Sequence, residues 1–249
     1  MATETLPIHR PVNRNRERIF FSGMAILLCV VVFIGFSPTY FRAGMLRAPL
    51  PSPILHVHGA VFTLWMVLFA VQAALISARR VAWHRSLGTI AFCLPPVMII
   101  LGVIAAIDAL GRKVKIGHLD PSVSSAIPLI GIVGFTIVIF ASWRARRKPD
   151  AHKRLILLAT IGLVEAAFGR FPWDRIGLPT AAGATTGLGI LILFVIAYDL
   201  VSLHRIHRST AWAAAPLTFA FGALAVPIGM TPAWHSFAAF LARNIAPHL

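Results

Sequence analysis

The chain has 249 residues, of which 58% are hydrophobic and only 12% carry a charged side chain. An ordinary soluble domain carries about 25% charged residues, so this composition excludes a soluble globular protein and is typical of an integral membrane protein. We therefore expect an all-α bundle in one transmembrane domain, because helices satisfy their own backbone hydrogen bonds in a bilayer.

Seven apolar stretches recur along the chain, each within the roughly 17 to 25 residues that a membrane-spanning helix needs. They cover residues 19–36, 54–77, 87–110, 123–143, 155–173, 184–203 and 211–229. The last contains Pro216 and Pro227, which lipid-embedded helices tolerate better than soluble ones. Pro95, Pro96 and Pro128 predict kinks inside the third and fourth spans.

Lysine and arginine residues predict the orientation, because they are enriched in loops that stay in the cytoplasm. With the N-terminus inside, 15 of the 23 basic residues fall on the cytoplasmic side, among them Arg10, and 8 fall on the opposite side, among them Arg47. The prediction is a bacterial inner-membrane protein with a basic cytoplasmic tail (1–18), a seven-helix transmembrane domain (19–230) and a short interfacial C-terminal helix (231–249). Anionic lipid headgroups are the expected partner of the net charge of +15, at about 1 kcal/mol per basic residue, and nucleic acid is not.

His56 and His58 stand at the predicted outer end of the second span. Two residues apart on a helix, they point roughly 200° from each other, so only one can face the bundle interior. His58 is followed at helical spacing by Phe62, Trp65 and Gln72, which gives one stripe of imidazole, aromatic and carboxamide side chains. Two interpretations remain open: an interfacial histidine above an aromatic packing stripe, or a contact to a quinone or haem.

Glu165 lies inside the fifth span. An acid near a helix centre costs about 2.5 to 3.5 kcal/mol on insertion scales, so such residues usually face the interior and mark function. Glu165 lies within about two helical turns in depth of His58, which predicts a proton-handling pair. Arg170, at the outer rim, is the candidate anion-holding group. In the competing interpretation Glu165 binds Arg170 or a backbone group and only locks helix packing.

A histidine followed by a basic residue recurs in three predicted cytoplasmic loops, where the third, fifth and seventh spans begin. The three sequences are HRSLG at His84, HKRLI at His152 and HRST at His207. Asp150, after Pro149, is the predicted N-cap of the middle helix, which puts His152 in its first turn. An imidazole, a cation and unpaired backbone donors at a helix start together predict an anion site.

Two hypotheses account for this recurrence. In the first, His84 and His152 lie at matched depth on separate helices and ligate a haem iron, with the adjacent basic residues at the haem propionates. In the second, the imidazoles and cations clamp lipid phosphates or a cytoplasmic partner. His84 lies 26 residues beyond His58, about 39 Å along a helix at ~1.5 Å per residue, so these two histidines cannot share one ligand.

Four stretches within residues 54–173 carry a resemblance to known families: LHVHGAVFTLWMVLFAVQAAL, HRSLG, DAHKRLILLAT and GRFPW. They resemble uncharacterised bacterial inner-membrane proteins that repeat H-R-x-x-G and H-[RK]-x-x-[ML] elements. More loosely, the segment is similar to the cytochrome b561-like haem proteins. That looser resemblance implies haem b held by histidines on paired helices and electron transfer with quinone, and it nominates His58, His84 and His152.

Three other classes of membrane protein each need particular residues. A retinal protein needs a lysine in its last span, and residues 211–229 contain none. A zinc-dependent intramembrane hydrolase needs three converging ligands, for which His58, Glu165 and Asp174 are the candidates, without an HExxH spacing. A proton-coupled transporter is the main alternative, because Glu165 and Gln72 would suit a polar path.

The sequence therefore predicts a haem b protein that serves quinone-linked electron transfer or supports a respiratory assembly, in contact with other membrane subunits. The alternative is a non-redox proton-coupled transporter or a lipid-interacting accessory protein. The proposed roles are iron ligation by His84 and His152, quinone or haem contact by His58, proton exchange by Glu165 and anion holding by Arg170. Asp199, in the sixth span, is expected to pair with Arg205 or His204.

Overall fold

The computed structural model describes residues 13–42 and 52–249, and over these ranges it is all-α, with no strand. Its helices are α1 (Arg14–Phe36), α2 (Pro53–Ser77), α3 (Val81–Ala91), α4 (Leu94–Gly111), α5 (Pro121–Arg144), α6 (Pro149–Phe168), α7 (Thr180–Leu203), α8 (Arg208–Thr218), α9 (Ala225–Gly229) and α10 (Pro232–Asn244). Two π-helical segments, Ser37–Phe41 and Phe219–Leu224, follow α1 and join α8 to α9. The all-α class is confirmed over these ranges. Most of the predicted basic tail, including Arg10, and the loop residue Arg47 lie outside the described residues.

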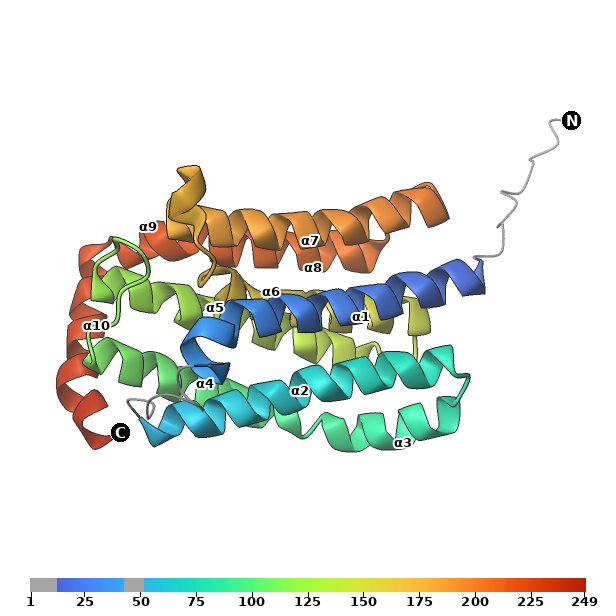
Figure 1. Ribbon diagram of the computed structural model, residues 1–249, viewed down its shortest axis with the longest axis horizontal. Helices are drawn as coiled ribbons and strands as arrows, with labels where there is room; N and C mark the ends of the chain where they lie inside the picture. Colours follow the sequence, from blue (N-terminus) through green and yellow to red (C-terminus); the bar gives the residue numbers. More distant parts are fainter. Residues whose placement is uncertain (1–12, 43–51) are drawn as a thin grey trace, which may run out of the picture.

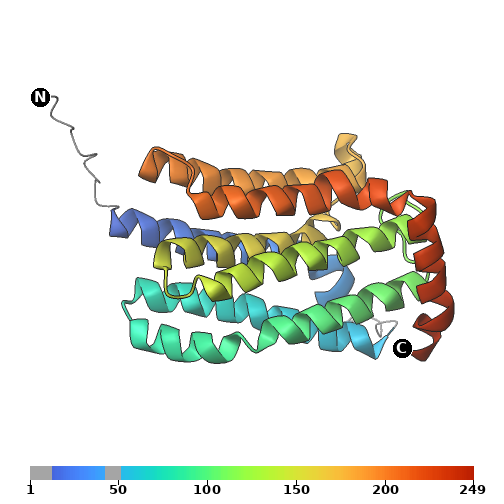
Figure 2. The ribbon, with the colours of Figure 1, turned by 180° about the vertical axis from the view of Figure 1, so that it is seen from behind.

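The long helices lie side by side and alternate in direction (Figures 1 and 2). α1, α3, α6 and α8 all start at the same end of the bundle, which we call the N-terminal end, and α2, α5 and α7 finish there. α10 lies across the opposite end. There, Ala238 and Leu241 pack against Ile107 and Leu110 of α4, and the Trp234 indole nitrogen donates to the backbone oxygen of Ser122 (2.9 Å).

Side-chain caps fix several of the helix starts. Asn13, Ser52, Asp120 and Thr231 each accept a hydrogen bond from a backbone N–H in the first turn of α1, α2, α5 and α10. Proline stands in the first turn of three of these helices, α2, α5 and α10, where its missing N–H costs nothing because those amides have no partner within the helix.

Prolines also divide the third pass of the chain. α3 ends at Ala91 and α4 begins at Leu94, so Pro95 and Pro96 lie in the first turn of a new helix. The ring of a proline excludes the helical hydrogen bond to the preceding turn, so the predicted kink is a complete break. Pro128, by contrast, lies within an unbroken α5.

Within residues 13–42 and 52–249, six helical segments are long and apolar enough to cross a membrane. They are Arg14–Phe41, Pro53–Ser77, Val81–Gly111, Pro121–Arg144, Thr180–Leu203 and Arg208–Gly229. They correspond to six of the seven predicted spans, although the third begins at Val81 rather than at residue 87. The predicted fifth span corresponds to α6, which ends at Phe168 and holds Asp150, Lys153, Arg154 and Glu165 within its 20 residues. The chain is a multi-pass membrane protein.

α6 supplies the centre of the hydrophobic core. Leu157, Leu158, Ile161 and Val164 are fully buried. Small residues allow its neighbours to approach: a Cβ atom placed on Gly35 of α1 would lie 2.5 Å from the backbone oxygen of Ala167, and one on Gly187 of α7 would lie 2.7 Å from the Phe168 ring. Such glycines at helix contacts are common in membrane bundles, where close backbone packing replaces the hydrophobic effect.

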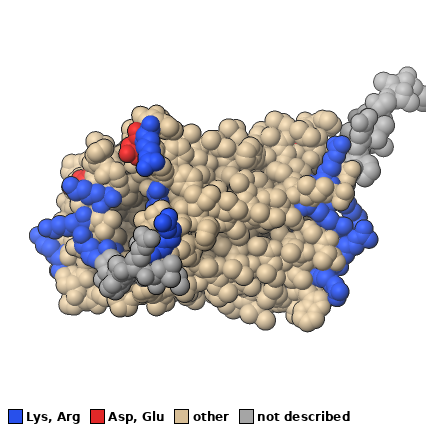
Figure 3. All heavy atoms as spheres, viewed as in Figure 1, with Lys and Arg blue, Asp and Glu red and all other residues tan. Residues whose placement is uncertain are grey.

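Charge is confined to the two ends of the molecule on the face seen in Figure 3. Lys and Arg side chains gather at both ends and leave an apolar middle band between them. Large apolar side chains such as Ile26, Phe33, Ile100, Phe140 and Leu193 are exposed to the surroundings of the bundle. A bilayer needs this distribution, with hydrocarbon around the band and headgroups at the basic ends.

Candidate functional site

His84 and His152 come together at the N-terminal end of the bundle. Each is the fourth residue of its helix, in α3 and α6, and the two imidazoles lie close enough to interact electrostatically. The sequence predicted a loop at His84, but α3 begins three residues before it.

The prediction of Asp150 as the N-cap of α6 is wrong. Lys148 is the N-cap, because the helix begins at Pro149, for which the first helical position is favourable.

The His152 ring is held by Ser142 of α5. Its Nδ1 atom lies 3.0 Å from the backbone oxygen of Ser142 and 3.1 Å from its hydroxyl, and Ser142 is fully buried. A carbonyl oxygen can only accept, so Nδ1 carries the proton and Nε2 keeps its lone pair. The Phe92 ring packs 6.1 Å from the imidazole and also contacts Trp143. His152 therefore offers an unprotonated nitrogen in a fixed orientation.

The His84 ring is bound by Gln72 of α2. The Gln72 amide nitrogen donates to Nδ1 of His84 and to its backbone oxygen (3.2 Å), while the amide oxygen accepts from the Gly88 nitrogen (2.9 Å). Nδ1 is then an acceptor, and Nε2 of His84 carries the proton. Gln72, which the sequence placed on the stripe of His58, acts instead at the opposite end of α2.

The two histidines differ in their fitness as haem ligands. An iron ligand needs an unprotonated Nε2 and an Nδ1–H that donates to an acceptor. His152 meets both conditions as it stands. His84 meets them when the Gln72 amide turns over, so that its oxygen faces Nδ1, at the cost of the bonds to the His84 oxygen and to Gly88. His152 as it stands, and His84 after that rotation, would present the nitrogen atoms that a haem iron takes.

His58 lies near the opposite end of α2. Its ring stacks on Phe62, with centroids 4.1 Å apart and an angle of 26°, and its Nδ1 atom is buried without a hydrogen-bond partner among the described residues. One helical position away, a Cβ on Gly59 would lie 2.9 Å from the Tyr40 ring. His58 is thus packed among aromatic rings with one polar atom unsatisfied.

Glu165 and Arg170 belong to the same end. Glu165 is 8% exposed, and its side chain makes no hydrogen bond or ion pair within residues 13–42 and 52–249. Arg170 is exposed, donates to the backbone oxygen of Ala166 and lies over the Phe36 ring at 4.1 Å. The charge of Arg170 acts on both His58 and Glu165. The predicted bond between His58 and Glu165 is not formed, so Arg170 is the neighbour that the two residues share.

A buried polar network that the sequence did not reveal joins α6, α7 and α8. The Arg154 guanidinium donates to Oδ1 of Asp199 through Nε (2.8 Å) and a terminal nitrogen (2.6 Å), and to the backbone oxygen of Asp150 (2.8 Å). The other Asp199 oxygen accepts from the Thr210 hydroxyl and from the backbone nitrogen of His207 (3.0 Å). Arg154, Asp199 and Thr210 are all buried.

This network corrects the expected pairing of Asp199 with Arg205 or His204. α7 ends at Leu203, and His204 adopts a left-handed conformation (φ 53°) that turns the chain away, which leaves both candidates exposed. One feature of the sequence could have indicated that Arg154 is buried. Its spacing places it on the same helical face as Leu158 and Ile161, both fully buried.

His207 sits beside this network as the N-cap of α8. Its Nδ1 accepts from the Ser209 backbone nitrogen at 3.1 Å. Burial lowers the pKa of His207, and the nearby Arg154 charge adds to this effect. The ring is therefore kept neutral, as its role of hydrogen-bond acceptor requires.

The zinc hypothesis finds no support in the ligand arrangement. Within the described ranges, no group of three or more His, Cys, Asp or Glu side chains converges, so His58, Glu165 and Asp174 do not form a common site.

Comparison of the chain with protein-family models, curated proteins and solved structures finds no match.

Proposed function

We propose that this protein binds haem b at the N-terminal end of its bundle, where His84 and His152 would hold the iron. It would serve quinone-linked electron transfer, or support a respiratory assembly, in a bacterial inner membrane. The observation that carries the proposal is the bond from Nδ1–H of His152 to the Ser142 carbonyl, because ligating histidines characteristically donate their second N–H in this way. Haem at this position would supply one-electron transfer.

The surroundings of the pair support the same function. Gln72 lies beside Nδ1 of His84, and with its amide turned so that the oxygen faces Nδ1 it would set the tautomer that leaves Nε2 free for iron. Arg85 lies beside His84 and acts on it electrostatically, which suits a group that holds a haem propionate. The resemblance of residues 54–173 to cytochrome b561-like proteins points to the same chemistry.

In this proposal the opposite end of the bundle receives the quinone. His58 would contact it through the nitrogen that has no partner, Arg170 would hold a developing negative charge, and Glu165 would exchange protons. Quinone reduction consumes protons together with electrons, so a carboxyl group in an apolar site beside an imidazole is a suitable donor. Neighbouring membrane subunits would be the electron donors or acceptors.

An absorption spectrum tests the haem proposal. The protein is expressed with ample haem, purified in detergent and measured as a reduced-minus-oxidised difference. A Soret band is expected, and His84→Ala and His152→Ala should each remove it, while His235→Ala, an exposed residue of α10, should keep it. A wild-type protein that folds without any band contradicts the proposal.

A proton-coupled transporter, or an accessory protein, is the second candidate. It is favoured by one observation, the buried Glu165 without a bonding partner in the described chain, since such groups line proton paths in transporters. Proteoliposomes that contain a pH-sensitive dye would report proton flux. Glu165→Gln should abolish the flux and Glu17→Gln, near the N-terminal end, should preserve it. Flux without any haem band would replace the redox proposal by this one.

A further inference from the structure

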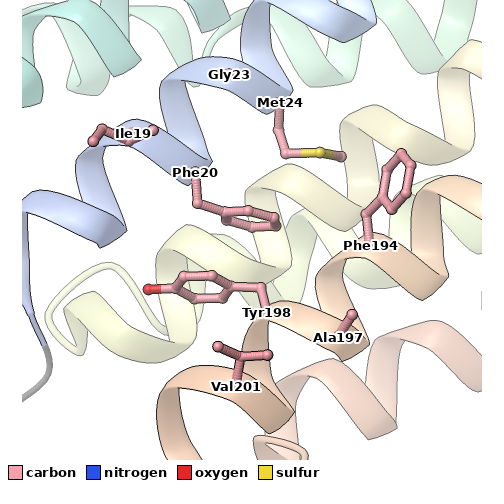
Figure 4. Close-up of a pocket in the computed structure, with 8 residues that line it drawn as sticks. All are labelled: Ile19, Phe20, Gly23, Met24, Phe194, Ala197, Tyr198 and Val201. Atoms are coloured by element: carbon pink, nitrogen blue, oxygen red, sulfur yellow. The ribbon is translucent and has the colours of Figure 1, made fainter.

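A groove of about 430 Å³ runs between α1 and α7, in the half of the bundle nearest the N-terminal end (Figure 4). Its lining includes Ile19, Phe20 and Met24 of α1, and Phe194, Tyr198 and Val201 of α7. Both helices belong to segments long and apolar enough to cross a membrane. The groove therefore lies at the depth of lipid hydrocarbon, and it is apart from the histidine pair.

The groove has a closed floor and an open side. The Phe20 and Tyr198 rings stack with centroids 4.1 Å apart and an angle of 11°, and so bridge the two helices (Figure 4). Tyr198 and Met24 are only 8% and 4% exposed, whereas Ile19 and Val201 at the rim are 66% and 70% exposed. The opening thus faces outward, toward the lipid.

Gly23 leaves room within the groove. A Cβ atom placed on it meets no other atom within 4 Å, in contrast to Gly35 on the same helix, which is pressed against α6. Ala197 gives the opposite wall a small, exposed side chain.

Two cations lie at the N-terminal end of the bundle, beyond the residues that line the groove. Arg16 lies one helical turn before Phe20, so it continues the same face of α1. Arg205 follows the end of α7, four residues after Val201. Both are exposed, and neither makes an ion pair with any described residue, whereas nearby Lys153 is paired with Glu17 and Asp150.

We propose that the groove binds one acyl chain of an anionic phospholipid, phosphatidylglycerol, whose phosphate lies between Arg16 and Arg205. Lipid tails are as apolar as the side chains of a helix, so an apolar groove alone gives little preference among lipids. Selection comes from the two arginines, which attract an anionic headgroup through its net negative charge. A zwitterionic headgroup has no net charge and is attracted less. This site is independent of the haem proposal and remains if that proposal fails.

Native mass spectrometry of the detergent-purified protein tests the site. Phosphatidylglycerol and phosphatidylcholine with the same chains are titrated separately. One tightly retained phosphatidylglycerol is expected, preferred roughly tenfold (about 1.4 kcal/mol) over phosphatidylcholine. The double variant Arg16→Gln/Arg205→Gln should lose this preference and bind both lipids alike.

Variants that fill the groove separate it from general lipid binding. Gly23→Leu and Ala197→Leu, from opposite walls, should each remove the retained lipid. Gly189→Leu is the matched control, because Gly189 of α7 also has open space around it but does not line the groove. Thermal unfolding identifies any variant that fails to fold, and the variant from the other wall then provides the test. Equal retention of phosphatidylcholine, retention by Gly23→Leu and Ala197→Leu, or preferential retention of ubiquinone would each overturn the proposal.

Discussion

Arg154 of α6 and Asp199 of α7 form an ion pair that is closed off from solvent, with side chains 2% and 0% exposed and a nitrogen-to-oxygen distance of 2.6 Å. Further hydrogen bonds from Thr210 and from the His207 backbone complete the coordination of the carboxylate. A pair so enclosed links three helices at one point. Replacing one residue of the pair and replacing both should therefore change the free energy of unfolding by different amounts.

Asp199→Leu alone should lower the free energy of unfolding by about 3 to 5 kcal/mol, because it leaves the Arg154 charge buried without a partner. The double variant Arg154→Met/Asp199→Leu should be clearly more stable than Asp199→Leu. Thermal unfolding in detergent measures both. Arg112→Met is the control, since its ion pair with Asp108 is partly exposed and should contribute less than about 1 kcal/mol. A double variant no more stable than the single one would show that the arginine finds another partner.

The stability of the protein should fall as the pH falls below about 6.5, in part through His207. Burial disfavours the charged ring, so the pKa of His207 is lower in the folded protein than its ordinary value of 6.5. As the pH falls, the unfolded chain binds the proton first, and the contribution that is complete above pH 6.5 is progressively lost.

The variant His207→Asn isolates this contribution. An asparagine oxygen still caps α8 but does not titrate. Unfolding temperatures at pH 7.5 and 5.5 should differ less in His207→Asn than in the wild type, whereas the exposed His235→Asn should keep the wild-type difference. Equal pH dependence in His207→Asn and the wild type would assign the effect to other groups.

Two glycines of α1 should respond oppositely to alanine. Gly35→Ala forces a methyl group against the Ala167 backbone and should cost about 1 to 3 kcal/mol. Gly23→Ala meets open space and should be neutral or slightly stabilising, because alanine favours the helix. Thermal unfolding of the two variants side by side checks the contact between α1 and α6, and equal effects would argue against it.

Gln72 should control haem affinity if His84 is a ligand. Gln72→Glu places an acceptor beside Nδ1 under either orientation, which favours the tautomer with a free Nε2 and should raise the affinity. Gln72→Leu removes the partner and should lower it, on the order of 10- to 100-fold. Titration of haem into the purified apoprotein, followed at the Soret band, gives both values. The same affinity in all three proteins would exclude His84 from the iron.

The fold was largely predictable because hydropathy is a local property. Six of the seven spans follow from the apolar stretches alone. Two boundaries differed from the prediction. α3 begins at Val81 rather than at residue 87, and a second helix, α4, begins at Leu94, with Pro95 in its first turn. α6 has the length of a span but carries four charged residues, of which Lys153 and Arg154 are paired with acids within the bundle.

The site was predictable only in its residue types. The recurrence of histidines before basic residues pointed to His84 and His152, which the structure brings together. Their partners, Gln72 and Ser142, lie on other helices and carry no local signal, because helix order decides which side chains meet. For the same reason the local sequence pointed to Arg205 or His204 as the partner of Asp199, whereas the actual partner, Arg154, lies 45 residues away.

The distance in sequence between Arg154 and Asp199 also bears on biosynthesis. α6 emerges from the ribosome with Arg154 and Glu165 in its sequence before Asp199, 45 residues after Arg154, has emerged. α6 alone should therefore partition poorly from the translocon into lipid. We expect it to stay at the translocon until α7 emerges, so that the two helices enter the bilayer together as a hairpin.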